Sequence, residues 1–314
     1  MKQDDFEAAY LRAHRAGLLP ERIELAFKLL ENCCVCPRNC RVNRLKGERG
    51  ICRAGYFPEV SSHSPHFGEE RPLVGAGGSG TIFLTHCNLR CSFCQNYSIS
   101  HLGEGREVSF DRLARMMIEL QRLGCHNINF VTPTHFVPQI LKALALAIEA
   151  GLRIPLVYNS SGYDAVETLA LLDGIVDIYM PDIKFATAAP AAEYCDAATY
   201  PEVARLAIKE MHRQVGDLVL DRNGIARRGV LVRHLVLPEG LAGTREAMRF
   251  LAAEISRNTY VNIMDQYYPC GEVLPSSALG RRITMEEYEE AVRAAKEEGI
   301  TRLDKQERLR LVWF

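Results

Sequence analysis

The sequence predicts an α/β fold built around a parallel sheet. From residue 80 onward, short apolar runs alternate with amphipathic segments, and together they make six strand–helix units. Most of the apolar runs are nearly continuous, which is typical of strands buried on both faces. Strands that alternate with helices form parallel sheets covered by helices. Such a sheet carries its chemistry at the carboxyl ends of the strands, so the residues after each run are the candidates for a site.

Each expected element has a local justification in the sequence. The apolar runs place strands over 80–86, 126–133, 153–162, 174–185, 228–238 and 259–268. The helical periodicity places helices over 110–123, 138–151, 164–174, 201–216, 244–255 and 284–299. Several of these helices end at a glycine, a common helix stop. One or two further helices are expected within 1–31, and Asn223-Gly224 predicts a β-hairpin within 217–229.

Composition limits the function classes. The chain has 314 residues, 47% of them hydrophobic, with 38 Lys and Arg against 39 Asp and Glu. This near-zero balance argues against a general polyanion binder, so no nucleic-acid partner is expected. No uncharged apolar run is long enough for a transmembrane helix, and the polar start lacks a signal-peptide core. We therefore expect a cytoplasmic protein with no membrane partner.

Cysteine usage points to metal chemistry. The chain has 11 cysteines, and eight of them fall into two clusters, between Cys33 and Cys52 and between Cys87 and Cys94. In a reducing compartment, clustered thiols are typical of metal or redox sites rather than of disulfides. Composition and spacing together predict a metalloprotein.

The second cluster follows the first expected strand. Cys87, Cys91 and Cys94 have the spacing C-x3-C-x2-C, and three thiolates in one short loop suit an iron–sulfur cluster or zinc. Structural zinc needs four ligands, and His86 is the one nearby candidate, expected to point away. A four-iron cluster held by three cysteines leaves one iron open to another ligand. The alternative is a set of structural cysteines or a zinc loop, but the position after a strand favours an active site.

This loop, with an aromatic residue (Phe93) before the last cysteine, resembles the signature of the radical S-adenosylmethionine (SAM) superfamily. The resemblance covers about residues 76–270 and implies a partial (β/α)6 barrel of the TIM type and a [4Fe–4S] cluster whose open iron is chelated by SAM. It implies an oxidoreductase that reductively cleaves SAM to methionine and a 5′-deoxyadenosyl radical, which abstracts hydrogen from a substrate. The cofactors supply this chemistry, and the protein orients them and excludes water. Residues 1–75 then form a helical, cysteine-rich extension, and 271–314 a C-terminal helix and tail.

Within the superfamily, the chain is most similar to the activating enzymes of glycyl radical enzymes, the pyruvate formate-lyase activating enzyme family, and their paralogues. The match lies in Asn96, two residues after the last cysteine, in Asn159-Ser-Ser-Gly after the third strand, in Met180-Pro-Asp-Ile-Lys after the fourth, and in an arginine on the fifth. It implies that the SAM carboxylate has cationic partners and a monovalent cation beside it. The alternative for Asp182 and Lys184 is an ion pair that caps a strand end. The residues assigned to cofactor binding are Phe93, Asn96, Asn159, Ser160, Asp182, Lys184 and Arg233.

Three departures from that family leave the substrate open. Thr132-Pro-Thr-His replaces the family's Gly-Gly-Glu, Asn159 replaces an aspartate, and the expected histidine is replaced within residues 265–267. The first hypothesis for the substrate is a glycine of a glycyl radical enzyme, which would be a protein partner. The second is a small molecule that is oxidised or rearranged, and the third, ranked last, is a non-enzymatic electron-transfer or cluster-carrier protein. A one-electron donor such as flavodoxin or ferredoxin is the expected reductant.

The first cysteine cluster predicts a second metal site. Cys33, Cys36, Cys40 and Cys52 are four thiols, with Cys34 spare, in a segment whose glycines permit tight turns. Four thiolates suit zinc or a second [4Fe–4S] cluster, and both stay open, as does a loop of free thiols. Five arginines crowd this segment and are expected either to reach cluster sulfurs or an acidic partner, or to form a solvated basic loop.

Two other features are weighed. Gly75–Gly80 fits G-x-G-x-x-G but precedes a strand, whereas a dinucleotide fingerprint follows one, so this reading is rejected. His135 is kept as a weak candidate on the substrate side, and Cys270 as a residue that could reach the barrel mouth. No catalytic side chain beyond the cluster ligands is predicted.

Overall fold

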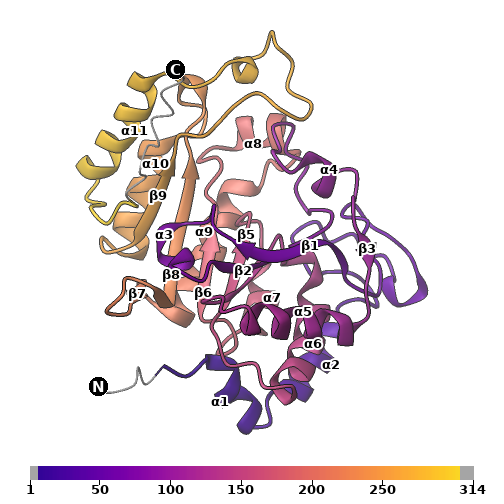
Figure 1. Ribbon diagram of the computed structural model, residues 1–314. Coiled ribbons are helices and arrows are strands. Elements are labelled where there is room, and N and C mark those ends of the chain that lie inside the picture. The colour runs from indigo at the N-terminus through magenta and orange to yellow at the C-terminus, as the bar shows by residue number, and fades with distance from the viewer. Residues whose placement is uncertain (1–5, 305–314) are drawn as a thin grey trace, which may run out of the picture.

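The computed structural model describes residues 6–304. Its centre is a nine-stranded sheet, in which six parallel strands curve into a partial barrel (Figure 1). In order around the barrel these are β2 (Ser79–Leu84), β4 (Ile128–Val131), β5 (Leu156–Ser160), β6 (Ile178–Pro181), β8 (Ala226–Leu235) and β9 (Tyr260–Met264). The predicted α/β fold and partial barrel are confirmed.

Helices flank the barrel strands. They are α5 (Phe110–Arg122), α6 (Val137–Glu149), α7 (Val166–Ala170), α8 (Ala188–Cys195), α9 (Tyr200–Val215), α10 (Thr244–Phe250) and α11 (Met285–Glu297). All but α8, which was not predicted from the sequence, lie where the sequence places them. Local capping explains two of the starts: the Ser109 hydroxyl accepts from the Arg112 amide, and Thr284 and Glu287 form a capping box. Alternate strand residues such as Ile82 and Phe130 point outward and share one apolar core with helix residues such as Leu113 and Leu141.

The amino-terminal part also holds short elements. Two helices, α1 (Ala9–Arg15) and α2 (Leu19–Lys28), lie within the expected helical region, of which residues 1–5 lie outside the described part of the chain. The expected hairpin is present, because β7 (Val219–Leu220) pairs antiparallel with β8. Within residues 6–304, every helix is too short or too polar to cross a membrane.

The strands expected from the sequence begin at residue 80, but the structure has one further strand before them, within residues 32–75. Residues Glu59–His66 form β1, which pairs antiparallel with β2 and carries the short β3 (Arg106–Glu107) on its other edge. The chain then enters α3 (Arg71–Val74), where Leu73 packs inside the barrel with Val157, Ile178 and Leu231. The interior of the barrel away from the carboxyl ends of the strands, here called the lower interior, is therefore filled by apolar side chains, as in other parallel barrels. The space for chemistry lies at the carboxyl ends of the strands.

Candidate active site and metal centres

The three cysteines of the C-x3-C-x2-C motif lie in the loop between β2 and α4 (Tyr97–Ser100), at the carboxyl end of the first barrel strand. Backbone hydrogen bonds hold this loop on both sides of Cys91: the Arg90 amide donates to the Cys195 carbonyl at 3.2 Å, and the Ser92 amide to the Tyr194 carbonyl at 2.9 Å. The carboxyl end of α8 thereby fixes the loop. His86 binds Glu59 through Nε2 at 3.2 Å rather than joining the cysteines.

The chemistry of this thiol set fits an iron–sulfur cluster. Burial, together with the neighbouring Cys91, raises the pKa of Cys87 to about 12, and burial also raises the pKa of Cys94. Thiolates are the ligands that iron–sulfur clusters use, and a cluster that binds here must displace the protons of these thiols. Among residues 6–304, no three Cys, His, Asp or Glu side chains are already arranged to hold a metal ion, so the sulfurs must converge on binding.

A charge cluster with a buried carboxylate and two partly buried cations faces this loop from the ends of β6 and β8. The Asp182 carboxylate accepts from Lys184 Nζ at 2.7 Å and from Arg233 Nε at 2.8 Å. Burial would raise the pKa of Asp182, but Arg233 and Lys184 more than offset it, so the pKa is lowered. The same carboxylate raises the pKa of both cations against the effect of burial. All three groups are therefore charged at neutral pH.

Arg233 also connects this cluster to β5, because its Nη2 donates to Asn159 Oδ1 at 2.7 Å. The chain turns sharply after β5 at Gly162, which has a φ of +77°, and a Cβ there would come within 2.4 Å of the Asp182 carbonyl. Glycine is thus needed to bring the ends of β5 and β6 together. One guanidinium consequently spans the side chains at the ends of two strands.

The predicted cofactor residues and the three cysteines line one cavity. Its walls include Cys87, Cys91, Phe93, Cys94, Asn96, Asn159, Ser160, Asp182, Lys184 and Arg233. These residues come from the cluster loop and from the ends of three different strands, which is the arrangement that a barrel active site needs. The structure thereby brings together every residue that the sequence assigned to the radical-generating cluster and to SAM.

Individual side chains in the cavity differ in how free they are to bind a ligand. The Ser160 hydroxyl donates to Asp164 at 2.6 Å, so it also holds its own loop. Phe93 is buried and packs edge-on against Phe185 and Tyr267 at 5.9 and 6.2 Å between ring centres. Asn96 is exposed and precedes α4 without a side-chain capping bond.

Two acidic residues inside the barrel were not anticipated from the sequence. Glu70 Oε1 accepts from Asn262 Nδ2 at 3.1 Å and lies 3.9 Å from Arg233 Nε. Burial raises the pKa of Glu70 to about 7 against the opposing effect of Arg233, and burial likewise raises the pKa of Glu69. No motif marks this pair, which reaches the barrel only because β1 and α3 carry the chain there.

Two further features also went unnoticed at the sequence level. The sulfur of Cys195 lies 3.1 Å from that of Cys91, although the two residues are 104 positions apart. Thr132, which lines the cavity where the activating-enzyme family has glycines, adopts a left-handed φ of +59°. A β-branched residue rarely adopts this conformation, and such strain is often found at functional sites.

The weak histidine candidate lies elsewhere. His135 is fully buried, bonds the Thr85 carbonyl through Nε2 at 2.9 Å, and does not line the cavity. Burial lowers its pKa to about 3, so it stays neutral. The suggestion that His135 faces the substrate is therefore wrong. Cys270 is half-buried and donates to the Phe93 carbonyl at 3.3 Å, behind the cluster loop.

The four amino-terminal cysteines also come together. Cys33 is fixed by backbone bonds to Val42 and Arg41 of 2.9 and 3.0 Å, which fold the segment back on itself. Burial, followed by the neighbouring thiol of Cys52, raises the pKa of Cys36, and Cys33 and Cys40 act in the same direction. The four thiols are therefore close enough to affect one another, but within residues 6–304 no three of them are already arranged around a metal position, so here too the sulfurs would have to converge on binding.

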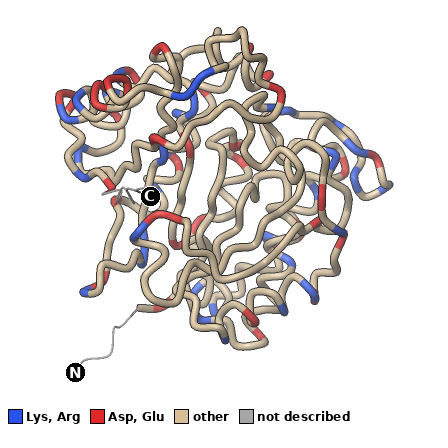
Figure 2. Tube along the Cα trace, turned by 45° about the horizontal axis from the view of Figure 1, so that its top comes forward, with Lys and Arg blue, Asp and Glu red and all other residues tan. Residues whose placement is uncertain are grey.

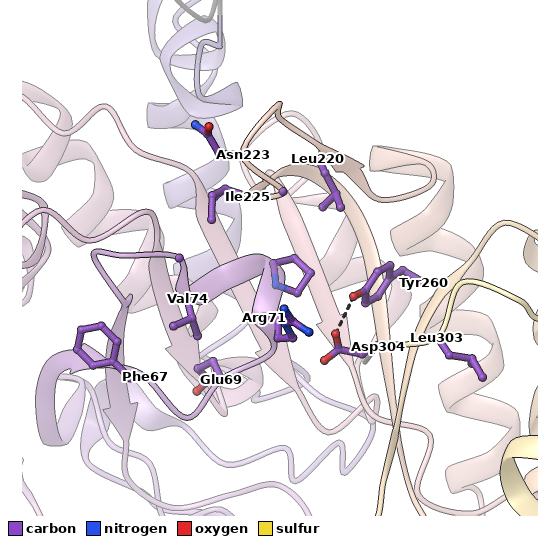
Figure 3. Close-up of a pocket in the computed structure, with 13 residues that line it drawn as sticks. Phe67, Glu69, Arg71, Val74, Leu220, Asn223, Ile225, Tyr260, Leu303 and Asp304 are labelled. Atoms are coloured by element: carbon purple, nitrogen blue, oxygen red, sulfur yellow. Dashed lines mark hydrogen bonds between the residues drawn. The ribbon is translucent and has the colours of Figure 1, made fainter. Parts of the chain in front are cut away.

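Another cavity, of about 620 Å³, lies at the amino-terminal end of the barrel strands (Figure 3). It is bordered by α3, the β7–β8 hairpin and the start of β9, where the Tyr260 hydroxyl donates to Asp304 Oδ1 at 2.7 Å. It contains Glu69 but none of the predicted site residues. The chemistry-bearing cavity is therefore the one at the cluster loop.

Comparison with known proteins agrees with this geometry. Residues 81–213 match the family model described as the Radical SAM superfamily. The chain is 33% identical over 304 residues to MJ0674, an uncharacterized protein of Methanocaldococcus jannaschii, covering 93% of this chain and 82% of that protein. It is 26% identical over 219 residues to MJ0808, another uncharacterized protein of that organism, covering 60% and 63%.

Among solved structures, a radical SAM methyltransferase from Sphaerobacter thermophilus is similar, with a TM-score of 0.46, 14% identity, and coverage of 70% of this chain and 64% of that one. The match of residues 81–213 to the family model carries the classification, and the match to MJ0674 adds a relative along most of the chain. The chain belongs to the radical SAM superfamily.

Proposed function

We propose that this protein cleaves SAM reductively at the Cys87–Cys94 loop and abstracts hydrogen from a substrate bound in the adjoining cavity. A [4Fe–4S] cluster and SAM, when bound, supply the one-electron cleavage of the sulfonium to methionine and a 5′-deoxyadenosyl radical. The observation that carries the proposal is that the three cysteines share one cavity with the Lys184–Asp182–Arg233 charge cluster.

The residues of this chain have separable tasks in that reaction. Cys87, Cys91 and Cys94 would hold the cluster. Lys184 and Arg233 provide charge-assisted hydrogen bonds to the SAM carboxylate, while Asp182 keeps both cations in place. The buried Phe93 closes the floor of the loop and helps to exclude water from the reacting centre.

A monovalent cation beside the carboxylate is implied by the resemblance to activating enzymes. In this chain, Asn159 and Asp182, which match two cation-side residues of that family by motif, both accept hydrogen bonds from Arg233. A monovalent cation would have to share these two oxygens with the guanidinium of Arg233, which already places a positive charge beside them. We therefore propose that Arg233 takes the place of the cation.

For the substrate, we propose a glycine of a glycyl radical enzyme, on the strength of the sequence resemblance. The second candidate is a small molecule, favoured by the replacement of the Gly-Gly-Glu motif by Thr132 and its neighbours. The two are distinguished by incubating the reduced enzyme with deuterated candidates. Deuterium in 5′-deoxyadenosine identifies the hydrogen donor, and an electron paramagnetic resonance (EPR) signal of a glycyl radical on an added protein would identify the first class.

The basic reaction is tested with anaerobically reconstituted protein and dithionite. We expect 5′-deoxyadenosine from the unmodified protein and none from Cys91→Ala. Cys125→Ala is the matched control, because Cys125 is equally buried but lies in the core beneath the helices. Product formation by Cys91→Ala at the unmodified rate would contradict the proposal.

We also propose that Cys33, Cys36, Cys40 and Cys52 hold a second metal, either zinc or a second [4Fe–4S] cluster. The nearness of the four thiols supports it, as does Gly50, where a Cβ would come within 2.8 Å of the Cys40 sulfur. A variant with Cys87, Cys91 and Cys94 changed to alanine should retain this metal alone. Adding Cys36→Ala should remove it, and a triple variant that holds neither iron nor zinc would refute this site.

A further inference from the structure

One arginine connects the two cysteine segments. Arg38 lies between Cys36 and Cys40, and its side chain reaches the cluster loop, where Nε donates to the Asn88 carbonyl at 2.7 Å. The guanidinium also lies over the face of the Tyr163 ring, with 5.6 Å between its carbon and the ring centre. The side chain is largely buried by these contacts, with 10% of it exposed. The amino-terminal cysteine segment is therefore docked directly on the loop that holds the radical-generating cluster.

Two short paths lead from Arg38 to cluster ligands. The first path runs through the peptide group between Asn88 and Leu89. Its carbonyl accepts from Arg38, and its amide, that of Leu89, donates to the Cys87 sulfur at 3.4 Å. Arg38 Nη2 also donates to the Cys195 carbonyl at 3.4 Å, and the Cys195 sulfur lies 3.1 Å from that of Cys91. Hydrogen-bonded contacts thus link the first cysteine set to two of the three cluster ligands.

The outer face of this segment has an unusual charge. Residues 33–53 contain six Lys and Arg but one Glu, whereas the whole chain has a net charge of −1. Arg41, Lys46 and Arg53 are exposed and form no ion pair with a carboxylate of residues 6–304. The loop lies at the right-hand side of Figure 2, where its cations show as blue segments.

Apolar side chains lie among these cations. Leu45 and Ile51 are 40% and 45% exposed. A basic face that includes exposed aliphatic groups is suited to an acidic protein rather than to a small anion, because the apolar contacts add area to the charge attraction.

We propose that an acidic one-electron donor protein docks on this basic face, and that its electron passes through the amino-terminal metal centre to the radical-generating cluster. This inference rests on the proposed function. The donor is oxidised by one electron, the amino-terminal centre is reduced and then reoxidised, and the second cluster is reduced by one electron. Because zinc has no redox chemistry, the amino-terminal centre must then be iron–sulfur.

The first experiment isolates electron entry. In the variant with Cys87, Cys91 and Cys94 changed to alanine, reduced flavodoxin, an acidic donor, is mixed with the protein and the amino-terminal centre is followed by absorbance and EPR. We expect iron in the centre and its reduction by flavodoxin. Zinc in place of iron, or no reduction by flavodoxin, would overturn the proposal.

The second experiment compares reductants in the reconstituted protein that holds both centres. Arg41→Glu combined with Lys46→Glu should slow flavodoxin-driven 5′-deoxyadenosine formation by about tenfold or more, because electrostatic steering changes association rates by roughly 10–10³. The dithionite-driven rate should be unchanged, since a small reductant does not need the docking face. The matched control, Arg222→Glu with Arg257→Glu, reverses two exposed charges outside the segment and should leave both rates unchanged.

The outcomes separate this inference from the proposed function. Equal slowing with both reductants would show a structural role for the basic face, and an unchanged flavodoxin rate would place the donor elsewhere, so either result would overturn the inference. No 5′-deoxyadenosine from the unmodified protein with either reductant would instead overturn the proposed function itself.

Discussion

Replacing Arg233 with methionine removes a guanidinium but keeps a side chain of similar length. In the structure, this group bonds Asp182 at 2.8 Å and Asn159 at 2.7 Å, inside the cavity that the cysteines border. The substitution leaves Lys184 as the one cation bound to Asp182 among the described residues. Its effect on SAM binding therefore measures how much the cofactor carboxylate depends on this arginine.

The magnitude follows from one lost charge-assisted hydrogen bond. Such a bond is worth about 1.5–3 kcal/mol, and about 1.4 kcal/mol corresponds to a tenfold change in affinity. We expect SAM to bind roughly ten- to hundredfold more weakly to Arg233→Met. We expect the smaller loss, because two of the Arg233 donors already bind Asp182 and Asn159. The SAM affinity of Arg233→Lys should lie between that of the unmodified protein and that of Arg233→Met, since an ammonium restores the charge but not the planar guanidinium.

The assay is a calorimetric titration of SAM into anaerobically reconstituted protein, with iron content measured on the same samples. The cluster should survive, because its thiolates are untouched. Lys184→Met should weaken SAM binding similarly, and Arg213→Met, which breaks an exposed ion pair with Glu210, should not. Unchanged affinity in both the Arg233 and the Lys184 variants would show that these residues are only members of a structural ion pair.

Three further predictions test other parts of the site. Thr132→Gly should raise the free energy of unfolding by about 1 kcal/mol, because it relieves a left-handed β-branched residue; a lower melting temperature would show that the side-chain contacts outweigh the strain. The raised pKa of Glu70 means that the folded protein loses stability as pH rises from about 4.5 to about 7. Glu70→Gln should therefore raise the free energy of unfolding at pH 8, by an amount on the order of 1–3 kcal/mol, and not at pH 4.5, as measured by denaturant unfolding at both pH values. Exchanging sodium or potassium for a large organic cation should leave SAM affinity unchanged if Arg233 fills the cation position, and a tenfold loss would refute that role.

Much of the fold follows from local sequence signals. Apolar runs and helical periodicity locate all six parallel strands and most of the helices, because both depend on residues near each other in the chain. The expected strand over 174–185 ends earlier, at Pro181, since Asp182 and Lys184 leave the ladder to form the charge cluster. β1 was not predicted because Glu59–His66 contains Ser, His and Pro65, a composition that suits an edge strand and not a buried one.

The site residues likewise fall into those that local sequence patterns identify and those that they miss. Cysteine spacing and the polar residues after each apolar run identify the walls of the cavity, because a parallel barrel brings strand ends together whatever the details of packing. Cys195 and Glu70 could not be found from spacing. Each meets its partner across the fold, and the contact depends on how α8 and the β1–β2 connection are placed. Long-range contacts of this kind leave no local pattern in one sequence.

The charge cluster in the upper barrel also argues for function on energetic grounds. The lower interior shows that this barrel can be filled by side chains such as Leu73, Val157 and Leu231. Burying an ion pair costs several kcal/mol of desolvation per ion, and replacing such a pair with apolar residues is often neutral or stabilising. Asp182, with its two cations, therefore offers the fold little that leucine would not. Its value lies in keeping the cations charged and oriented toward a ligand that carries a carboxylate, which the cavity at the cluster loop is placed to receive.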